Sequence, residues 1–217
     1  MTRLLQVQPS CVQFFYSHKR GGKGVVYANL LFLVAMFFSL SNVATALPIV
    51  PVRVQSPPVI DGKLEDSIWQ SAQQYRDFLS YEPTVGNPSS QATIAYAAYD
   101  DQNLYFGFRC FDTQPEKVVA SLTKRDNIDS EDRVGVILDT QKDQQSAVGF
   151  IVNPLGVQED VMFDEKFDSD ATEDFVWSSA GTMDDEGYTV EIHIPLNSLR
   201  YASGDKVAMG IGFWRYN

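Results

Sequence analysis

Alternation of apolar and polar positions recurs along most of the chain after residue 90. In NLYFGFRCF (residues 103–111), every second side chain from Leu104 to Cys110 is apolar, whereas Arg109 stands on the opposite side. A period of two is that of a β-strand with one face in a core. ATIAYAAYD (residues 92–100) precedes this segment, and the turn-forming DDQN between them predicts a hairpin. We therefore expect Cys110 to be a buried thiol with a packing role.

Five further segments have the composition of strands. They are RVGVILD (133–139), AVGFIVN (147–153), GVQEDVMF (156–163), GYTVEIHIP (187–195) and VAMGIGFWRY (207–216). The turn sequences QKDQQ, NPLG and DDEG lie between them. Only LEDSIWQSA (64–72) has apolar residues at helical spacing, over about two turns. Many short strands at intervals of roughly ten residues predict an all-β fold, an antiparallel two-sheet β-sandwich of immunoglobulin or jelly-roll type with one or two very short helices.

The first 46 residues have a different pattern. They contain four bases and no acid, an uncharged apolar run VVYANLLFLVAMFFSL (25–40), and a small-x-small site that ends at Ala46. These features predict a signal peptide with a helical apolar segment, cleaved after Ala46. A membrane anchor is the alternative, but the run is shorter than the roughly 20 residues that span a bilayer. We expect an exported protein of the periplasm, outer membrane or extracellular space, with an extended proline-rich segment at 47–58 and one module at 59–217.

Removal of the signal peptide makes the chain more acidic. The whole chain has 17 Lys and Arg against 28 Asp and Glu, a formal net charge of −11, and loss of four bases takes this to −15. Such a surface repels nucleic acid and anionic lipid, and suits neutral hydroxyl-rich ligands or divalent cations. Cys11 leaves with the signal peptide, so Cys110 has no partner in the mature chain and a disulfide framework is excluded.

Catalytic motifs are scarce. The mature chain has one histidine, His193, on the polar face of a predicted strand, which favours a surface histidine. There is no G-x-S-x-G, H-E-x-x-H or C-x-x-C, and RGGKG (20–24) precedes no P-loop lysine–serine pair. Two-carboxylate glycoside hydrolysis needs only acids, one of which must be kept protonated by an apolar setting. Most acids here cluster beside turns, where they stay ionised, but this reaction remains an open alternative.

The segment MFDEKFDSDATEDFVW (162–177) holds six carboxylates. It has part of the spacing of an EF-hand loop, but no glycine makes the central bend. A looser calcium site is predicted at Asp164, Asp168 and Asp170, because clustered carboxylates repel one another and a cation relieves this repulsion. A solvated acidic loop is the alternative.

Tryptophans are candidate sugar contacts, because the C–H face of a pyranose packs on an aromatic ring. Trp69 lies on the apolar side of the predicted helix and Trp214 lies within a strand, so both are expected in the core. Trp177 ends the acidic segment, where a ligand can reach it; packing in the core or at its rim is the alternative.

Five motifs follow one another between residues 52 and 216: PPVIDGKLEDSIWQSA, ATIAYAAYDDQNLYFGFRCFD, DRVGVILDT, GYTVEIHIPLNSLRY and MGIGFW. Their order resembles carbohydrate-binding module family 9. The resemblance implies a β-sandwich that binds sugars without cleaving them, often attached to xylanases or other glycosidases, with structural calcium. VGFIVNPLGVQED (148–160) is closer to a branch found in bacterial envelope proteins, where the module resembles an amino-terminal domain. That branch implies an outer-membrane barrel region following Asn217 and missing from this chain.

The chain departs from the family at the sugar site that the resemblance implies. Sugar-binding members clamp the ligand between two tryptophans, one of which precedes the strand that matches DRVGVILD. This chain has Asp129, Ser130 and Glu131 there, and Gly135 where the family has a glutamate. The second clamp tryptophan falls beyond the end of the chain.

We therefore predict a non-catalytic carbohydrate-binding module for plant-type polysaccharide or oligosaccharide of the xylan or cellulose class, in a carbohydrate catabolic setting. Candidate contacts are Trp177 for stacking and Arg125, Asp126 and Asn153 for hydroxyl groups, because all four lie at strand ends or in loops. Two alternatives stay open. One is a structural or assembly domain of an outer-membrane protein without sugar binding, and the other is part of a glycoside hydrolase such as a xylanase.

Overall fold

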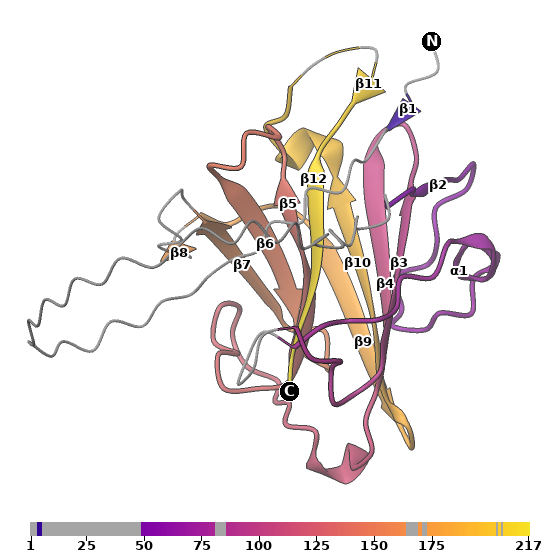
Figure 1. The fold of residues 1–217 in the computed structure, drawn as a ribbon, viewed down its shortest axis with the longest axis vertical. Coiled ribbons are helices and arrows are strands. Elements are labelled where there is room, and N and C mark those ends of the chain that lie inside the picture. The colour runs from indigo at the N-terminus through magenta and orange to yellow at the C-terminus, as the bar shows by residue number, and fades with distance from the viewer. Residues whose placement is uncertain are drawn as a thin grey trace, which may run out of the picture.

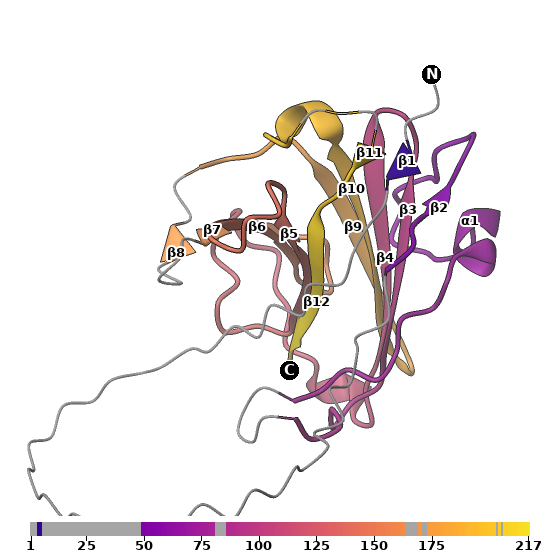
Figure 2. The same ribbon diagram turned by 45° about the horizontal axis from the view of Figure 1, so that its top comes forward.

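The computed structural model describes residues 4–5, 49–80, 86–163, 169–170, 173–202, 204 and 206–217. Two five-stranded sheets face each other in it (Figures 1 and 2), which confirms the predicted two-sheet β-sandwich. Apart from residues 4–5, the predicted signal peptide lies outside the described residues. Within the described ranges, no helix has the length and apolar character needed to cross a membrane.

The first sheet has the strand order β2-β3-β4-β10-β9. Its strands are β2 (Val52–Arg53), β3 (Thr93–Tyr99), β4 (Asn103–Phe111), β10 (Gly187–Pro195) and β9 (Ser178–Asp184). Neighbouring strands are antiparallel except β2 and β3, which are parallel. The predicted hairpin is present as β3 and β4, with Thr93 opposite Cys110. Strand β9 was not predicted.

The second sheet has the order β12-β5-β6-β7-β8, with every pair antiparallel. Its strands are β12 (Gly210–Tyr216), β5 (Arg133–Asp139), β6 (Ala147–Val152), β7 (Gln158–Phe163) and β8 (Ser169–Asp170). A separate parallel pair joins β1 (Leu4–Leu5) to β11 (Lys206–Val207).

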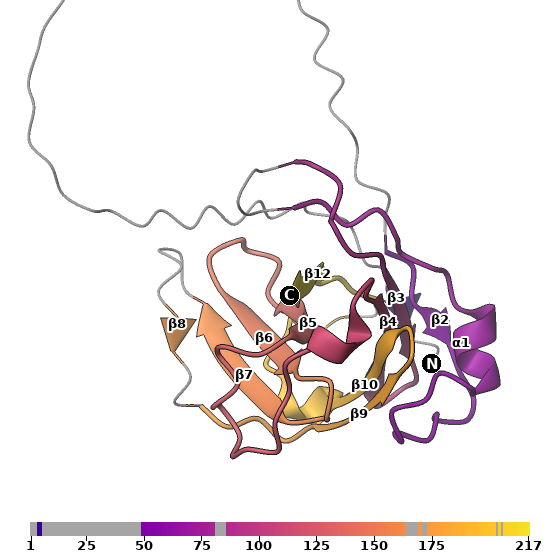
Figure 3. The same cartoon turned by 90° about the horizontal axis from the view of Figure 1, so that it is seen from below.

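The helices are short, as predicted. They are α1 (Ser67–Ser71) and the 3-10 turns η1 (Pro115–Lys117) and η2 (Leu196–Ser198). The turn η1 lies at the lower end of the sandwich in Figure 1, and Figure 3, a view from below, shows α1 outside the first sheet. Helix α1 therefore takes no part in the space between the two sheets.

The main core fills the space between the sheets. Phe108 and Cys110 of β4 face inward and are 0% exposed, as the alternation in the sequence predicts. Phe150 of β6 and Val136 of β5 meet them from the second sheet and are also fully buried. The period-two pattern has therefore identified the inner face of β4 correctly.

A second apolar cluster covers the outer face of the first sheet. Ile68 and Trp69 of α1 pack there with Tyr96 and Tyr105, and Trp69 is 2% exposed. The helix approaches closely because Gly107 of β4 lies beneath it: a Cβ at this position would come within 2.8 Å of a Leu64 methyl and 3.3 Å of the Trp69 ring. Trp69 is thus buried as predicted, but in this outer cluster.

Arg215 of β12 connects the two sheets. Its Nη1 donates to the carbonyl oxygens of Ala92 (3.2 Å) and Phe111 (2.9 Å) and to Thr93 Oγ1 (3.1 Å), all at one end of β3 and β4. Its guanidinium lies 5.4 Å from the centre of the Tyr188 ring, and its side chain is 3% exposed. A buried cation from the second sheet therefore satisfies backbone oxygens of the first.

Candidate functional site

Asp160 of β7 is the centre of a buried polar network. Arg125 donates to its carboxylate from Nε at 2.9 Å and from Nη2 to both oxygens. The backbone N–H of Phe175 (2.7 Å) and the indole N–H of Trp177 (3.1 Å) donate to the same carboxylate. Because Asp160 is 1% exposed, these donors take the place of water around its charge. The sequence analysis did not single out this residue.

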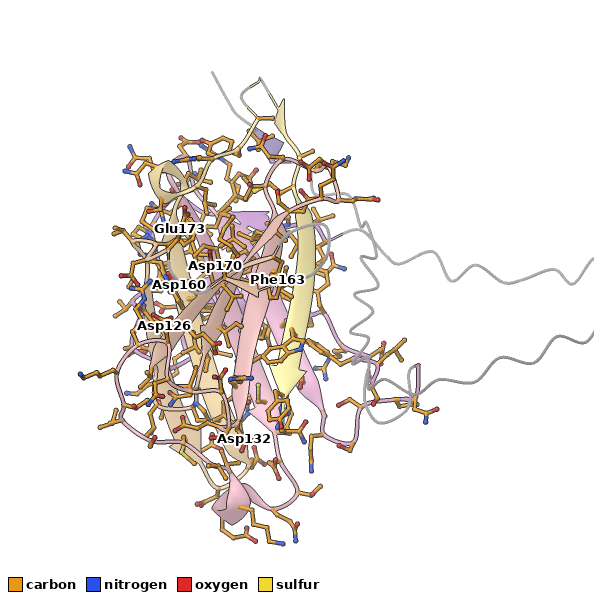
Figure 4. All side chains as sticks on the ribbon, turned by 90° about the vertical axis from the view of Figure 1, so that its left-hand side faces the viewer. Asp126, Asp132, Asp160, Phe163, Asp170 and Glu173 are labelled. Carbon is orange, nitrogen blue, oxygen red and sulfur yellow. The ribbon has the colours of Figure 1, made fainter. Side chains whose placement is uncertain are left out.

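Three of the four predicted sugar contacts, Arg125, Asp126 and Trp177, meet around Asp160. Asp126 Oδ1 accepts the backbone N–H of Asp160 at 3.1 Å, and the Asp126 N–H donates to the Gln158 carbonyl at 2.9 Å. Burial raises the pKa of Asp126, because loss of water disfavours its charged form. Figure 4 marks Asp126 and Asp160 on this side of the molecule. Here Arg125 and Asp126 fasten their loop to β7.

Trp177 lies in the core. It is 8% exposed, and its ring meets that of Phe150 edge-on with the centroids 5.3 Å apart. The Arg125 guanidinium lies 5.8 Å from its centroid, and its N–H is held by Asp160. This position differs from the accessible one that we predicted, because the indole has both an apolar and a polar partner inside the fold.

Asn153 has a role in turn formation that differs from the predicted sugar contact. Its Nδ2 donates to the Ser121 carbonyl (2.9 Å) and to Glu131 Oε2 (2.7 Å), and its Oδ1 accepts the N–H groups of Leu155 (3.0 Å) and Val157 (2.9 Å). All four hydrogen-bonding positions of the amide are therefore used. At 0% exposure, Asn153 presents no polar group to a hydroxyl.

Two of the predicted calcium ligands, Asp164 and Asp168, lie outside the described residues. Asp170 is in β8, opposite Met162 of β7, and is exposed; Figure 4 shows where it lies on the molecule. Among the described residues, no three His, Cys, Asp or Glu side chains gather as metal ligands would. Calcium binding stays a prediction.

A buried carboxyl of the kind that glycoside hydrolysis needs occurs at Glu191 of β10. It is 0% exposed, and burial raises its pKa. Its oxygens accept the indole N–H of Trp69 (2.8 Å) and the backbone N–H groups of Asp61 (3.0 Å) and Gly62 (2.8 Å). A catalytic acid must reach the leaving-group oxygen of its substrate. Glu191 instead holds the segment before α1 against the first sheet.

The outer face of the second sheet carries an aromatic pair that the sequence analysis missed. Trp214 and Tyr216 project from the same side of β12 with nearly parallel rings, 22° apart, and centroids separated by 6.3 Å. The Arg133 guanidinium lies 5.5 Å from the Trp214 centroid and 5.3 Å from that of Tyr216. Trp214 packs against the small cluster of Ile128 and Ile151 outside the main core, so its predicted place in the core is wrong. Its neighbour Phe213 takes the inward position.

The sheet beside this pair has glycines where other strands have side chains. Gly135 of β5 is opposite Trp214, and a Cβ there would collide with the Phe150 carbonyl oxygen of β6. This close approach accounts for the absence of a side chain where the resemblance implies a glutamate. Gly212, further along β12, has open space above it, since a Cβ there would meet only the Ile137 Cβ at 4.0 Å. The rings of Trp214 and Tyr216 therefore lie next to glycine backbone, from which no side chain projects.

Acidic side chains surround Arg133. Its Nη1 lies 3.2 Å from Asp129 Oδ1 and 3.3 Å from Glu159 Oε2, and its buried Nε has no hydrogen-bond partner among the described residues. Burial raises the pKa of Glu159, and the charge of Arg133 opposes this effect. We call Arg133, Glu159, Trp214 and Tyr216 the outer-face cluster. It combines flat apolar rings with hydrogen-bonding groups of both signs.

The fold is a two-sheet sandwich, and the outer-face cluster is the group of aromatic and charged side chains that we select as its candidate site. A family-wide sequence comparison matches residues 60–216 to the carbohydrate family 9 binding domain-like family. The chain belongs to this family. Comparison with curated proteins finds no match.

Solved structures agree with this assignment. A family 9 carbohydrate-binding module from Caldicellulosiruptor kristjanssonii in complex with cellotriose has a TM-score of 0.53 at 22% identity, covering 75% of this chain and 74% of that one. The complex of a family 9 module of that organism with glucose gives 0.50 at 22% identity, over 75% and 76%. A putative carbohydrate-binding protein from Bacteroides uniformis gives 0.59 at 11% identity, over 76% and 81%. At these identities the likeness shows a shared fold.

Proposed function

We propose that this chain binds a saccharide of the cellulose or xylan class without cleaving it, and that the outer-face cluster is the binding site. The single observation that carries the site is the pair of nearly parallel rings of Trp214 and Tyr216 beside Arg133. Aromatic faces pack on pyranose C–H groups, while charged side chains bond to hydroxyls. Membership of the family and structural neighbours in complex with cellotriose and glucose support the ligand class.

The polar groups of the cluster suit neutral sugar hydroxyls. Asp129 and Glu159 offer acceptor oxygens around the Arg133 guanidinium, and Asp129 is the most accessible of the three, with its side chain 88% exposed. Asp129 lies beside the cluster and adds a second carboxylate next to the one guanidinium, so the surroundings of Arg133 have an acidic balance and an anionic ligand would meet repulsion. We therefore infer an uncharged glucan or xylan chain as the ligand.

The test is calorimetric titration with cello-oligosaccharides and xylo-oligosaccharides. We expect heat of binding in the wild type and at least about thirtyfold weaker binding in Trp214→Ala, since a central aromatic contact contributes about 2 kcal/mol or more. Val176→Ala is the control, because Val176 is 75% exposed and takes no part in the cluster. If no glycan gives heat of binding, saccharide binding is refuted and a structural or assembly role is favoured.

Export and calcium binding extend this proposal. We propose that the precursor is cleaved after Ala46, which N-terminal sequencing of the exported protein would test by a mature chain beginning at Leu47. We also propose that Asp164, Asp168 and Asp170 take part in holding a calcium ion, since carboxylate oxygens are the ligands that this ion prefers.

A further inference from the structure

A chain of polar side chains on the outer face of the first sheet ends at an exposed serine. Ser178 begins β9 and lies directly opposite His193 of β10, with Ser178 Oγ 3.0 Å from His193 Nδ1. His193 Nε2 lies 2.8 Å from Oδ1 of Asn103, at the start of β4. Asn103 Nδ2 in turn lies 3.0 and 3.1 Å from the two carboxylate oxygens of Asp100. These groups are on the opposite sheet from the outer-face cluster.

Asp100 fixes the direction of every hydrogen bond in this chain. Burial acts to raise its pKa, but hydrogen bonds from Tyr105, Gln102 and Asn103 prevail and lower it, so the group is an ionised acceptor. Asn103 must therefore turn its NH₂ toward Asp100 and its carbonyl oxygen toward His193. An amide oxygen only accepts, so His193 Nε2 carries a hydrogen and donates it.

The remaining nitrogen of His193 is then a base. Burial lowers the pKa of His193 below its ordinary value of 6.5, which leaves the ring neutral at physiological pH. A neutral ring with its hydrogen on Nε2 has a lone pair on Nδ1. The Ser178 hydroxyl therefore donates to Nδ1, in the arrangement of a nucleophile, a base and a group that orients the base.

The packing around the three groups holds them in place. The His193 ring stacks on Tyr105 with centroids 5.3 Å apart and an interplanar angle of 17°. The Tyr105 hydroxyl donates to Asp100 at 2.7 Å, which connects the stacking partner to the same carboxylate. Trp177, which immediately precedes Ser178, is buried and bonded to Asp160, so the beginning of β9 is anchored.

We propose that Ser178 is a nucleophile activated by His193 and that it accepts acyl groups from carboxylic esters. Ser178 Oγ forms a bond to the ester carbonyl carbon while its proton passes to His193 Nδ1. The bond between that carbon and the alcohol oxygen then breaks, and the alcohol leaves with the proton from Nδ1. Water attacks the acyl-serine by the same sequence in reverse, which releases the carboxylic acid and restores Ser178. Asn103 is a positioning residue, and the negative charge of Asp100 favours the imidazolium that forms.

The test uses p-nitrophenyl acetate as the ester and the full chain as the protein. We expect release of p-nitrophenolate and, by peptide mass spectrometry, an acetyl group on Ser178. Ser178→Ala should abolish both, and His193→Gln should lower the rate about a hundredfold or more, the usual contribution of a general base. Ser179→Ala is the matched control and should leave the rate unchanged, because Ser179 Oγ donates to the Gly156 carbonyl instead.

A pH profile of the wild type keeps the proposal testable if His193→Gln fails to fold. The titratable groups that act on His193 are Asp100 and the stacked Tyr105. We expect the acylation rate to rise as the pH rises, because His193 must lose its proton to act as a base, and the midpoint of this rise should lie below pH 6.5. A rate with no such inflection, or acetylation that Ser178→Ala leaves unchanged, would overturn the proposal. Acylation and saccharide binding are measured separately and concern opposite sheets, so failure here is distinguishable from failure of saccharide binding.

Discussion

Replacement of Asp160 by alanine tests whether the buried network holds the loops to the second sheet. In Asp160→Ala, the N–H groups of Phe175 and Trp177 lose their acceptor, and Arg125 loses its principal counter-charge. Removal of one partner of a buried ion pair costs about 3–5 kcal/mol, because an uncompensated charge remains. The Arg125 side chain is 31% exposed and regains some hydration, so we expect about 3–4 kcal/mol.

The assay is urea unfolding followed by tryptophan fluorescence, with a melting curve beside it. A loss of this size should lower the melting temperature by about 10 °C for a domain of this length. Asp174→Ala is the control: Asp174 also contacts Arg125, at 3.5 Å, but its side chain is 76% exposed, so the loss should stay below about 0.5 kcal/mol. If Asp160→Ala and Asp174→Ala lose equal stability, the network around Asp160 does not have the role described above.

Three further predictions concern the second sheet and the acidic residues. Gly135→Ala should lower the free energy of unfolding by about 1–3 kcal/mol, because the added Cβ would collide with the β6 backbone. Gly212→Ala is the control and should change it by less than about 0.5 kcal/mol, because the space above Gly212 is open. Urea unfolding of both variants measures the difference. Burial acts to raise the pKa of Glu131, but hydrogen bonds from Ser121 and Asn153 prevail and lower it in the folded state. The ionised Glu131 therefore stabilises the fold at pH values above 4.5, its ordinary pKa, and this stabilisation is lost as the pH falls through the lowered pKa. Stability measured from about pH 6 to about pH 3 should therefore fall less steeply in Glu131→Gln, and parallel curves would contradict this account. If calcium binds, a chelator should lower the melting temperature, since a ligand that binds only the native state stabilises it by mass action; equal melting temperatures would leave the acidic segment as a solvated loop.

Strands with one apolar face could be predicted from the sequence alone. The inward side of β4, with Phe108 and Cys110, followed from alternation, because every second residue must enter the same layer. Strand β9, SSAGTMD, has no such alternation. Its small residues suit a strand at the edge of the sheet. A Cβ at Gly181 would lie only 2.5 Å from the Pro154 carbonyl oxygen, and this close approach exists only in the folded chain.

The candidate sites were harder to predict, because they depend on which face a side chain takes and on distant partners. In GIGFWRY both Phe213 and Trp214 are aromatic, and one of two adjacent strand residues must face outward. Asp160 gave no signal in QEDVMF, since its partner Arg125 is in a separate loop. Ser178 and His193 meet only because β9 pairs with β10, and the sequence analysis identified neither this strand nor its register.

The position of Arg215 has a consequence for the biosynthesis of the protein. The side chain that joins the layers comes from β12, whereas the oxygens it satisfies belong to β3 and β4, which the ribosome makes much earlier. Strand β12 also pairs with one edge of β5, which precedes it in the chain. A nascent chain that stops short of residue 215 lacks the Arg215 hydrogen bonds between the two sheets, so these bonds form only after β12 has been made.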